Sequence, residues 1–120
     1  MKMEPLTMFV VVRRDLVKTL AWPLGSVISQ GCHAATAALW TFREHPETIE
    51  YVTDLGNMHK VVYEIKNESQ LSALAQSLKE REIDFALWRE QPENMLTALS
   101  TRPYRRSELG DAFKKCGLFR

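Results

Sequence analysis

Hydrophobic residues in this chain form short continuous runs that alternate with helix-like stripes. The run at residues 6–13 is rich in β-branched and aromatic side chains and ends in charge, which predicts a buried central strand. Three more strands are predicted at residues 58–65, 85–89 and 95–101. Pro92 turns the chain between the last two of these, and Pro103 ends the fourth.

Four helices are predicted between the strands. Residues 26–43 are uncharged until their end and rich in alanine, as in a long buried helix, and residues 48–55 suit a shorter one after a break at His45-Pro46-Glu47. Leucine and alanine at spacings of three and four predict a helix at 68–81, capped by Asn67. A last amphipathic helix is expected at 107–115, whereas residues 15–25 lack a helical period and suggest a loop.

The order of these elements is β, α, α, β, α, β, β, α. It predicts an α/β fold, specifically a three-layer α/β/α sandwich in which helices cover both faces of a four-stranded mixed sheet. The 120 residues, of which 45% are hydrophobic and 26% charged, match one globular domain over residues 1–120.

One stretch, Thr19 to Phe42, carries no charged side chain and is long enough to cross a bilayer. Its proline, glycine, serine, glutamine and histidine residues favour a helix buried in a soluble protein instead, so no membrane partner is expected. The apolar run at 8–12 is too short for a signal peptide. Cys32 and Cys116 show no metal-ligand spacing, so we expect reduced thiols in the cytoplasm and neither a metal nor a cofactor. Cys32 is expected to be buried, because free cysteine is among the most buried residue types.

The predicted long helix carries a polar row. Ser26, Gln30 and His33 lie at intervals of four and three, so they share one face. Near a helix N-terminus such a row could bind an anion. The alternative is that Gln30 and His33 are buried polar groups satisfied by neighbouring backbone.

A second polar group follows the third strand at residues 90–94. Glu90 could act as a general base, and Gln91 or Asn94 could donate a hydrogen bond to an oxyanion. The alternative is a solvated turn. Arg13 and Arg14 occupy the equivalent position after the first strand.

The net charge of +1 at first argues against a nucleic-acid partner, but the charges are unevenly distributed. Residues 1–42 carry four basic and two acidic groups, residues 43–93 six and eleven, and residues 94–120 six and two. The basic ends, above all Arg102, Arg105 and Arg106, therefore suggest a phosphate-binding surface, and the alternative for each residue is a solvated basic face.

Several of these motifs together resemble the type II peptidyl-tRNA hydrolase family, most closely its peptidyl-tRNA hydrolase domain-containing subgroup. The similarity covers nearly the whole chain, from about Met8 onward. It rests on the following residues: Trp22-Pro23, Gly25-Ser26, Gln30 with His33-Ala34-Ala35-Thr36-Ala37-Ala38-Leu39, Asp54-Leu55-Gly56, Met58-His59-Lys60-Val61-Val62, Leu87-Trp88, Glu90-Gln91-Pro92-Glu93-Asn94 and Arg102-Pro103-Tyr104.

The resemblance implies a hydrolase that cleaves the ester between a peptide, or another N-blocked aminoacyl group, and the 3′ end of tRNA. Glu90 would orient or deprotonate water, Gln30, Asn94 and Lys18 would stabilise the oxyanion, and His33 would tune the site. Phosphates of the tRNA would be bound by the following residues: Arg13, Arg14, Ser26, Arg102, Arg105 and Arg106. The resemblance also makes a homodimer one option for assembly.

Two departures from the family pattern are visible. The family's Gly-Lys pair at the start of the long helix is Gly25-Ser26 here, and its Asp-Ala-Gly-x-Thr-Gln motif is replaced by residues 90–94, which retain a carboxylate at Glu90. A non-catalytic tRNA- or protein-binding module on the same scaffold is therefore the competing hypothesis.

Overall fold

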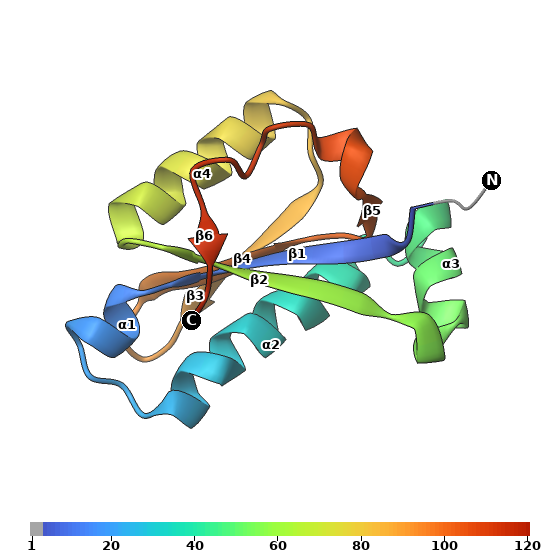
Figure 1. Ribbon diagram of the computed structural model, residues 1–120. Coiled ribbons are helices and arrows are strands. Elements are labelled where there is room, and N and C mark those ends of the chain that lie inside the picture. Colours follow the sequence, from blue (N-terminus) through green and yellow to red (C-terminus); the bar gives the residue numbers. More distant parts are fainter. Residues whose placement is uncertain (1–3) are drawn as a thin grey trace.

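The computed structural model describes residues 4–120 and has strand β1, Leu6–Arg13, at the centre of a mixed sheet (Figure 1). β1 is parallel to β2, His59–Ile65, and antiparallel to β4, Met95–Thr101, which in turn pairs with antiparallel β3, Phe85–Glu90. Two-residue strands β5, Tyr104–Arg105, and β6, Gly117–Leu118, add to β1 and β2. The four long strands lie where the sequence predicts them, but the expected count of four is wrong, because the sheet formed by residues 4–120 has six.

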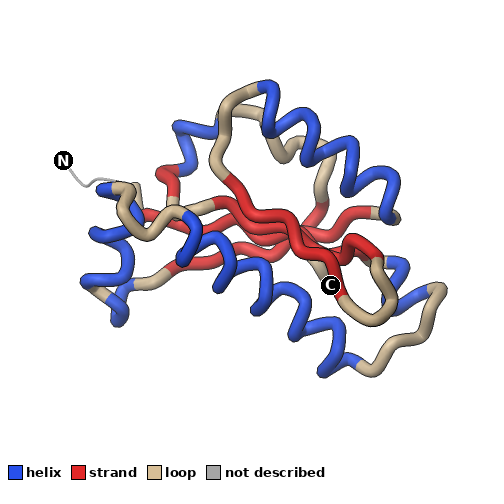
Figure 2. Tube along the Cα trace, turned by 180° about the vertical axis from the view of Figure 1, so that it is seen from behind, coloured by secondary structure: helices blue, strands red, loops and turns tan. Residues whose placement is uncertain are grey.

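The two faces of the sheet are covered by different helices. Helix α2, Leu24–Thr41, lies against one face, and α4, Glu68–Glu80, lies against the other (Figures 1 and 2). Successive side chains of β1 point to opposite faces of the sheet, so Val10 packs with the alanines of α2, and Phe9 packs with the leucines of α4. Both faces of the central strand are therefore buried, as its uninterrupted hydrophobic run predicts.

The helix boundaries differ from the sequence expectations in four places. A short helix α1, Asp15–Lys18, occupies part of the expected loop, and α2 begins at Leu24 directly after Pro23. Helix α3, Pro46–Thr53, starts at the proline that the sequence suggested as a break. This is favourable because proline at the first helical position lacks only an N–H that would be unpaired anyway. The 3₁₀ helix η1, Leu55–Asn57, replaces the expected end of α3.

The helix expected at residues 107–115 is wrong. A 3₁₀ helix η2, Arg106–Leu109, ends at Gly110, whose φ of +54° takes the backbone out of the right-handed helical region. Leu109 and Phe113 are nevertheless both buried against α4 and the sheet. The segment therefore contributes to the core, as an amphipathic element would, although turns rather than a helix carry these two residues.

The uncharged stretch from Thr19 to Phe42 folds mainly as α2. Across residues 4–120, no helix has the length and apolar character needed to cross a bilayer. Cys32 is exposed, which corrects the expectation of a buried thiol, and it lines a shallow apolar groove with Ile28 and Val62 beside β2. This outcome arises because α2 packs against β4, β3 and β1, so its side next to β2, which includes the exposed Ile28, is left uncovered by the sheet.

Candidate functional site

Three strands of the sheet have their carboxyl ends on the same side of the molecule, and this side is the edge referred to below. β2 is parallel to β1, and β3 runs in the same direction because both β1 and β3 are antiparallel to β4. The carboxyl ends of β1, β2 and β3 therefore meet near α1, the beginnings of α2 and α4, and the turn at residues 91–94 (Figure 1). Sheets covered by helices commonly bind ligands outside the carboxyl ends of their strands.

Glu90, the last residue of β3, is partly buried and firmly held. Its Oε1 accepts a hydrogen bond of 2.9 Å from the indole Nε1 of Trp88. The Trp88 ring stacks on the imidazole of His33 from α2, with 4.7 Å between ring centroids. Since the other carboxylate oxygen of Glu90 accepts no hydrogen bond from residues 4–120, it is available to a water or substrate proton.

Gln30 lies beneath this surface rather than on it. Its side chain is 2% exposed, its Nε2 donates to the backbone oxygen of Ser26 at 3.1 Å, and its Oε1 accepts from the hydroxyl of Thr97 at 2.7 Å. Of the two sequence interpretations, the buried and satisfied one fits Gln30, whereas His33 is exposed. Gln30 thereby fixes the first turns of α2 against β4.

The beginning of α2 carries Ser26 exposed on its first turn. Pro23 precedes the helix and provides no side-chain cap. The N–H groups of Ser26 and Val27 donate to the Pro23 carbonyl, whereas those of Leu24 and Gly25 have no acceptor within residues 4–120 and lie at the positive end of the dipole of this 18-residue helix. Because α2 starts at the edge where β3 ends, this uncapped terminus belongs to the same end of the molecule as Glu90.

Asn94 ends the turn that follows Glu90. It is exposed, and its φ of +56° lies in the left-handed region that asparagine tolerates better than most residues. Its Oδ1 accepts from the Gln91 side chain at 3.4 Å, and its backbone oxygen accepts from Arg89 at 3.1 Å. The amide nitrogen of Asn94 thus remains available at the surface.

Arg13 is internal. It is 5% exposed, donates two hydrogen bonds to the carboxylate of Asp15 at 2.9 and 2.8 Å, and donates a third to the backbone oxygen of Leu96 at 2.8 Å. The Leu96 N–H in turn donates to Glu68 at 2.7 Å. These bonds tie the end of β1 and the first turn of α4 to the β3–β4 hairpin that carries Glu90.

Lys18 lies in a separate polar cleft of about 630 Å³ that includes Arg14 and Lys66. Gln30, Glu90 and Asn94 do not line this cleft. The structure therefore groups Glu90 with His33 through Trp88, places Gln30 below them, and sets Lys18 apart from the three.

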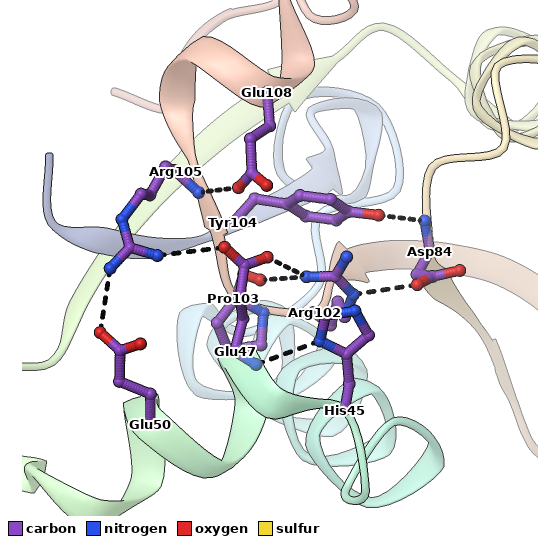
Figure 3. A network of polar contacts seen from close by, with 9 residues as sticks. All are labelled: His45, Glu47, Glu50, Asp84, Arg102, Pro103, Tyr104, Arg105 and Glu108. Atoms are coloured by element: carbon purple, nitrogen blue, oxygen red, sulfur yellow. Dashed lines mark hydrogen bonds and ion pairs between the residues drawn. The ribbon is translucent and has the colours of Figure 1, made fainter.

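The arginines expected to bind phosphate at the C-terminal end form an internal network (Figure 3). Arg102 is 6% exposed and bonds Asp84 at 2.9 Å and Glu47 at 2.8 Å. Arg105 bonds Glu47 at 3.1 Å and Glu50 at 2.9 Å. The network ties helix α3 to the segment after β4.

Burial alone would lower the pKa of Arg102, but hydrogen bonds from its guanidinium to Asp84 and Glu47 outweigh burial and raise that pKa above its usual value. The guanidinium also lies 3.8 Å from the ring centroid of Tyr104. Arg106 differs because it is exposed, contacts the Tyr63 hydroxyl at 3.3 Å and pairs with no carboxylate of residues 4–120.

Two residues that matter for this geometry were not among the predicted site residues. Trp88 connects His33 to Glu90, and its position two residues before Glu90 on a strand, which puts both side chains on one face, was an available signal. Thr97, the partner of Gln30, lies in β4 and gives no signal of its own in the sequence.

These features define an α/β protein with a carboxylate-bearing polar site at the carboxyl edge of a mixed sheet. The family model described as peptidyl-tRNA hydrolase PTH2 matches residues 6–119. The human protein named "Putative peptidyl-tRNA hydrolase PTRHD1" is 47% identical over 118 residues, which cover 98% of this chain and 84% of the relative. The mouse protein of that name is 45% identical over 116 residues, covering 96% and 83%. The chain belongs to the peptidyl-tRNA hydrolase PTH2 family.

Proposed function

We propose that this protein hydrolyses the ester between a peptidyl, or N-blocked aminoacyl, group and the 3′ end of tRNA, with Glu90 as the residue that activates water. The observation that carries the proposal is the position of this carboxylate. One oxygen is held by Trp88 and the other is open, at the edge where the strands end. A general base must be oriented and also have a free oxygen for the proton it removes.

The tetrahedral oxyanion needs positive groups opposite that base. The uncapped beginning of α2 supplies N–H groups and a helix dipole, and the exposed Asn94 amide supplies a further donor. Gln30, whose donor and acceptor are both engaged inside the protein, acts as a positioning residue for α2. His33 tunes the site through its stacking on Trp88.

Contacts with tRNA phosphates are assigned to cations that the fold leaves at the surface. Arg106 is exposed, and Arg14, which is half-buried with its Nε 3.5 Å from Glu64, lines the polar cleft at the strand ends. Arg13, Arg102 and Arg105 are engaged in internal ion pairs, so in this proposal they shape the surface without touching the ligand.

Purified protein should release the peptidyl group from a peptidyl-tRNA faster than the spontaneous rate, and an N-acetylaminoacyl-tRNA is a suitable substrate. The assay is best paired with a tRNA binding curve measured at several salt concentrations, because phosphate contacts make affinity fall as salt rises. Salt-dependent binding without ester cleavage would instead support the non-catalytic binding module.

Ser26→Lys should increase turnover, because it places an ammonium group on the exposed first turn of α2, where the family pattern has a lysine. A charge of this kind near a developing oxyanion is worth about tenfold or more in rate. Ser72→Lys, at an exposed position of α4, is the matched control and should leave the rate unchanged. Equal rates for both variants would place the reacting ester away from the beginning of α2.

The cytoplasm as the site of action and a homodimer as the assembly complete the proposal. The first rests on the cysteine pattern of the sequence, and the second rests on the family resemblance. Cell fractionation would test the first. Sedimentation velocity would test the second, because it distinguishes a 13.8 kDa monomer from a particle of twice that mass.

A further inference from the structure

The polar cleft at the strand ends contains cations from three separate parts of the chain. Lys18 is the last residue of α1, Lys66 joins β2 to α4, and Lys115 lies shortly before β6. The cleft occupies about 630 Å³ and is open to solvent on the edge where β1 and β2 end. Lys66 belongs to no motif of the sequence analysis and Lys115 only to the basic C-terminal end, so the fold alone reveals this grouping.

The carboxylates of the cleft do not neutralise these lysines. Asp15 is occupied by the two hydrogen bonds from Arg13, and Glu64 lies 3.5 Å from the Nε of Arg14. Within residues 4–120, neither Lys18, Lys66 nor Lys115 forms an ion pair or a side-chain hydrogen bond. The cleft therefore presents three uncompensated ammonium groups.

The ligand chemistry follows from the kind of donor present. The beginning of α4 is already capped, because the Asn67 side chain accepts from the Gln70 N–H at 3.0 Å. The cleft thus offers long, flexible ammonium groups instead of a compact cradle of N–H groups. Lysines of this kind act as point charges that suit phosphates spaced along a nucleic-acid backbone.

We propose that Lys18, Lys66 and Lys115 form a cleft that binds backbone phosphates of the tRNA. This inference rests on the proposed function, since it names the surface that holds the substrate whose ester Glu90 would attack. The cleft and Glu90 share one edge of the sheet, and the bonds of Arg13 to Asp15 and to Leu96 link the two. Cations distributed over the cleft would hold the RNA while its 3′ end reaches the carboxylate.

The test uses the double variant Lys66→Gln/Lys115→Gln, which leaves the residues proposed for catalysis intact. Its matched control is Lys79→Gln/Lys114→Gln, which removes the same charge from exposed positions outside this cleft. Affinity for deacylated tRNA is measured from 50 to 200 mM salt, with thermal unfolding as the check on folding. Each lost phosphate contact should flatten the log–log salt slope by about 0.7 to 0.9.

The cleft variant should bind tRNA roughly tenfold more weakly at low salt, with the slope reduced by about 1.5, as expected for two lost contacts. Its KM for peptidyl-tRNA should rise while its kcat stays unchanged. Affinity and slope equal to those of the control variant would overturn the cleft assignment. Displacement of tRNA by micromolar ATP at constant ionic strength would also overturn it, because the cleft would then serve a free nucleotide.

The binding experiment does not depend on hydrolysis, so the two proposals fail separately. If the wild-type protein cleaves no ester but the cleft variant loses tRNA affinity, the catalytic proposal fails and the cleft stands. If cleavage occurs and the cleft variant binds tRNA as the control does, only the cleft assignment fails.

Discussion

Arg102→Met is expected to lower the free energy of unfolding by about 3 kcal/mol, the lower end of what breaking a buried ion pair costs. The substitution keeps an apolar stem of similar length but leaves Asp84 without its cationic partner and leaves Glu47 paired with Arg105 alone. The lower end applies because the Asp84 side chain is 38% exposed and water can rehydrate it. The loss should be read from urea unfolding at neutral pH.

The matched control is Arg81→Met, which breaks the ion pair between Arg81 and Asp111 at the surface. Both of these side chains are well exposed, at 42% and 56%, and such pairs contribute about 1 kcal/mol or less. Arg102→Lys should fall between the two variants, because an ammonium retains the charge but cannot bond both carboxylates with the geometry of a guanidinium. A loss for Arg102→Met no larger than for Arg81→Met would show that the network contributes little to stability.

This network explains what the charge pattern of the sequence could and could not predict. The acidic middle and the basic C-terminal end were correctly identified as segments of opposite charge, and the inference drawn was a phosphate-binding surface. The fold instead brings Arg102 and Arg105 against Glu47, so these charges neutralise one another. Segment charge alone carries no information on which residues meet across 55 or more positions of the chain.

The long elements were predictable because each has its own periodic signal. Strand β1 is a continuous apolar run, and α4 carries an apolar stripe with Asn67 as its cap, as expected. The two-residue strands β5 and β6 have no such signal, since they exist only where the neighbouring strands β1 and β2 offer free backbone groups. Helix and turn were confused at residues 107–115 because both can place side chains four apart on one side.

The position of a candidate site residue was predictable where the strand or helix that contains it has a clear signal in the sequence. Glu90 and His33 lie on elements that the sequence places correctly, and the structure links them through Trp88. Lys18 was assigned to the site across an expected loop, but it ends the helix α1, which occupies part of that loop, and it lines another cleft. Gln30 could not be resolved from periodicity, because its partner Thr97 lies in a strand far along the chain.

Glu90→Gln should reduce kcat for peptidyl-tRNA by about 10² to 10⁴-fold, the range that a positioned general base contributes. The amide has nearly the same shape, and its oxygen can still accept the hydrogen bond from Trp88, so the hairpin should fold as before. The amide has no negative charge and cannot take a proton from water. The tRNA affinity and KM should stay close to the wild-type values, because the carboxylate is proposed to act on water and not on phosphate.

Glu93→Gln is the control for Glu90→Gln, since it removes one negative charge from an exposed position of the same turn. If the turn matters only as a source of negative potential near the substrate, both variants should change the rate to a similar, small extent. A base role predicts that only Glu90→Gln loses turnover and that the rate falls at saturating substrate. Unchanged hydrolysis by Glu90→Gln would remove Glu90 from the mechanism. The attacking water would then have to be activated by another group near the carboxyl ends of β1, β2 and β3.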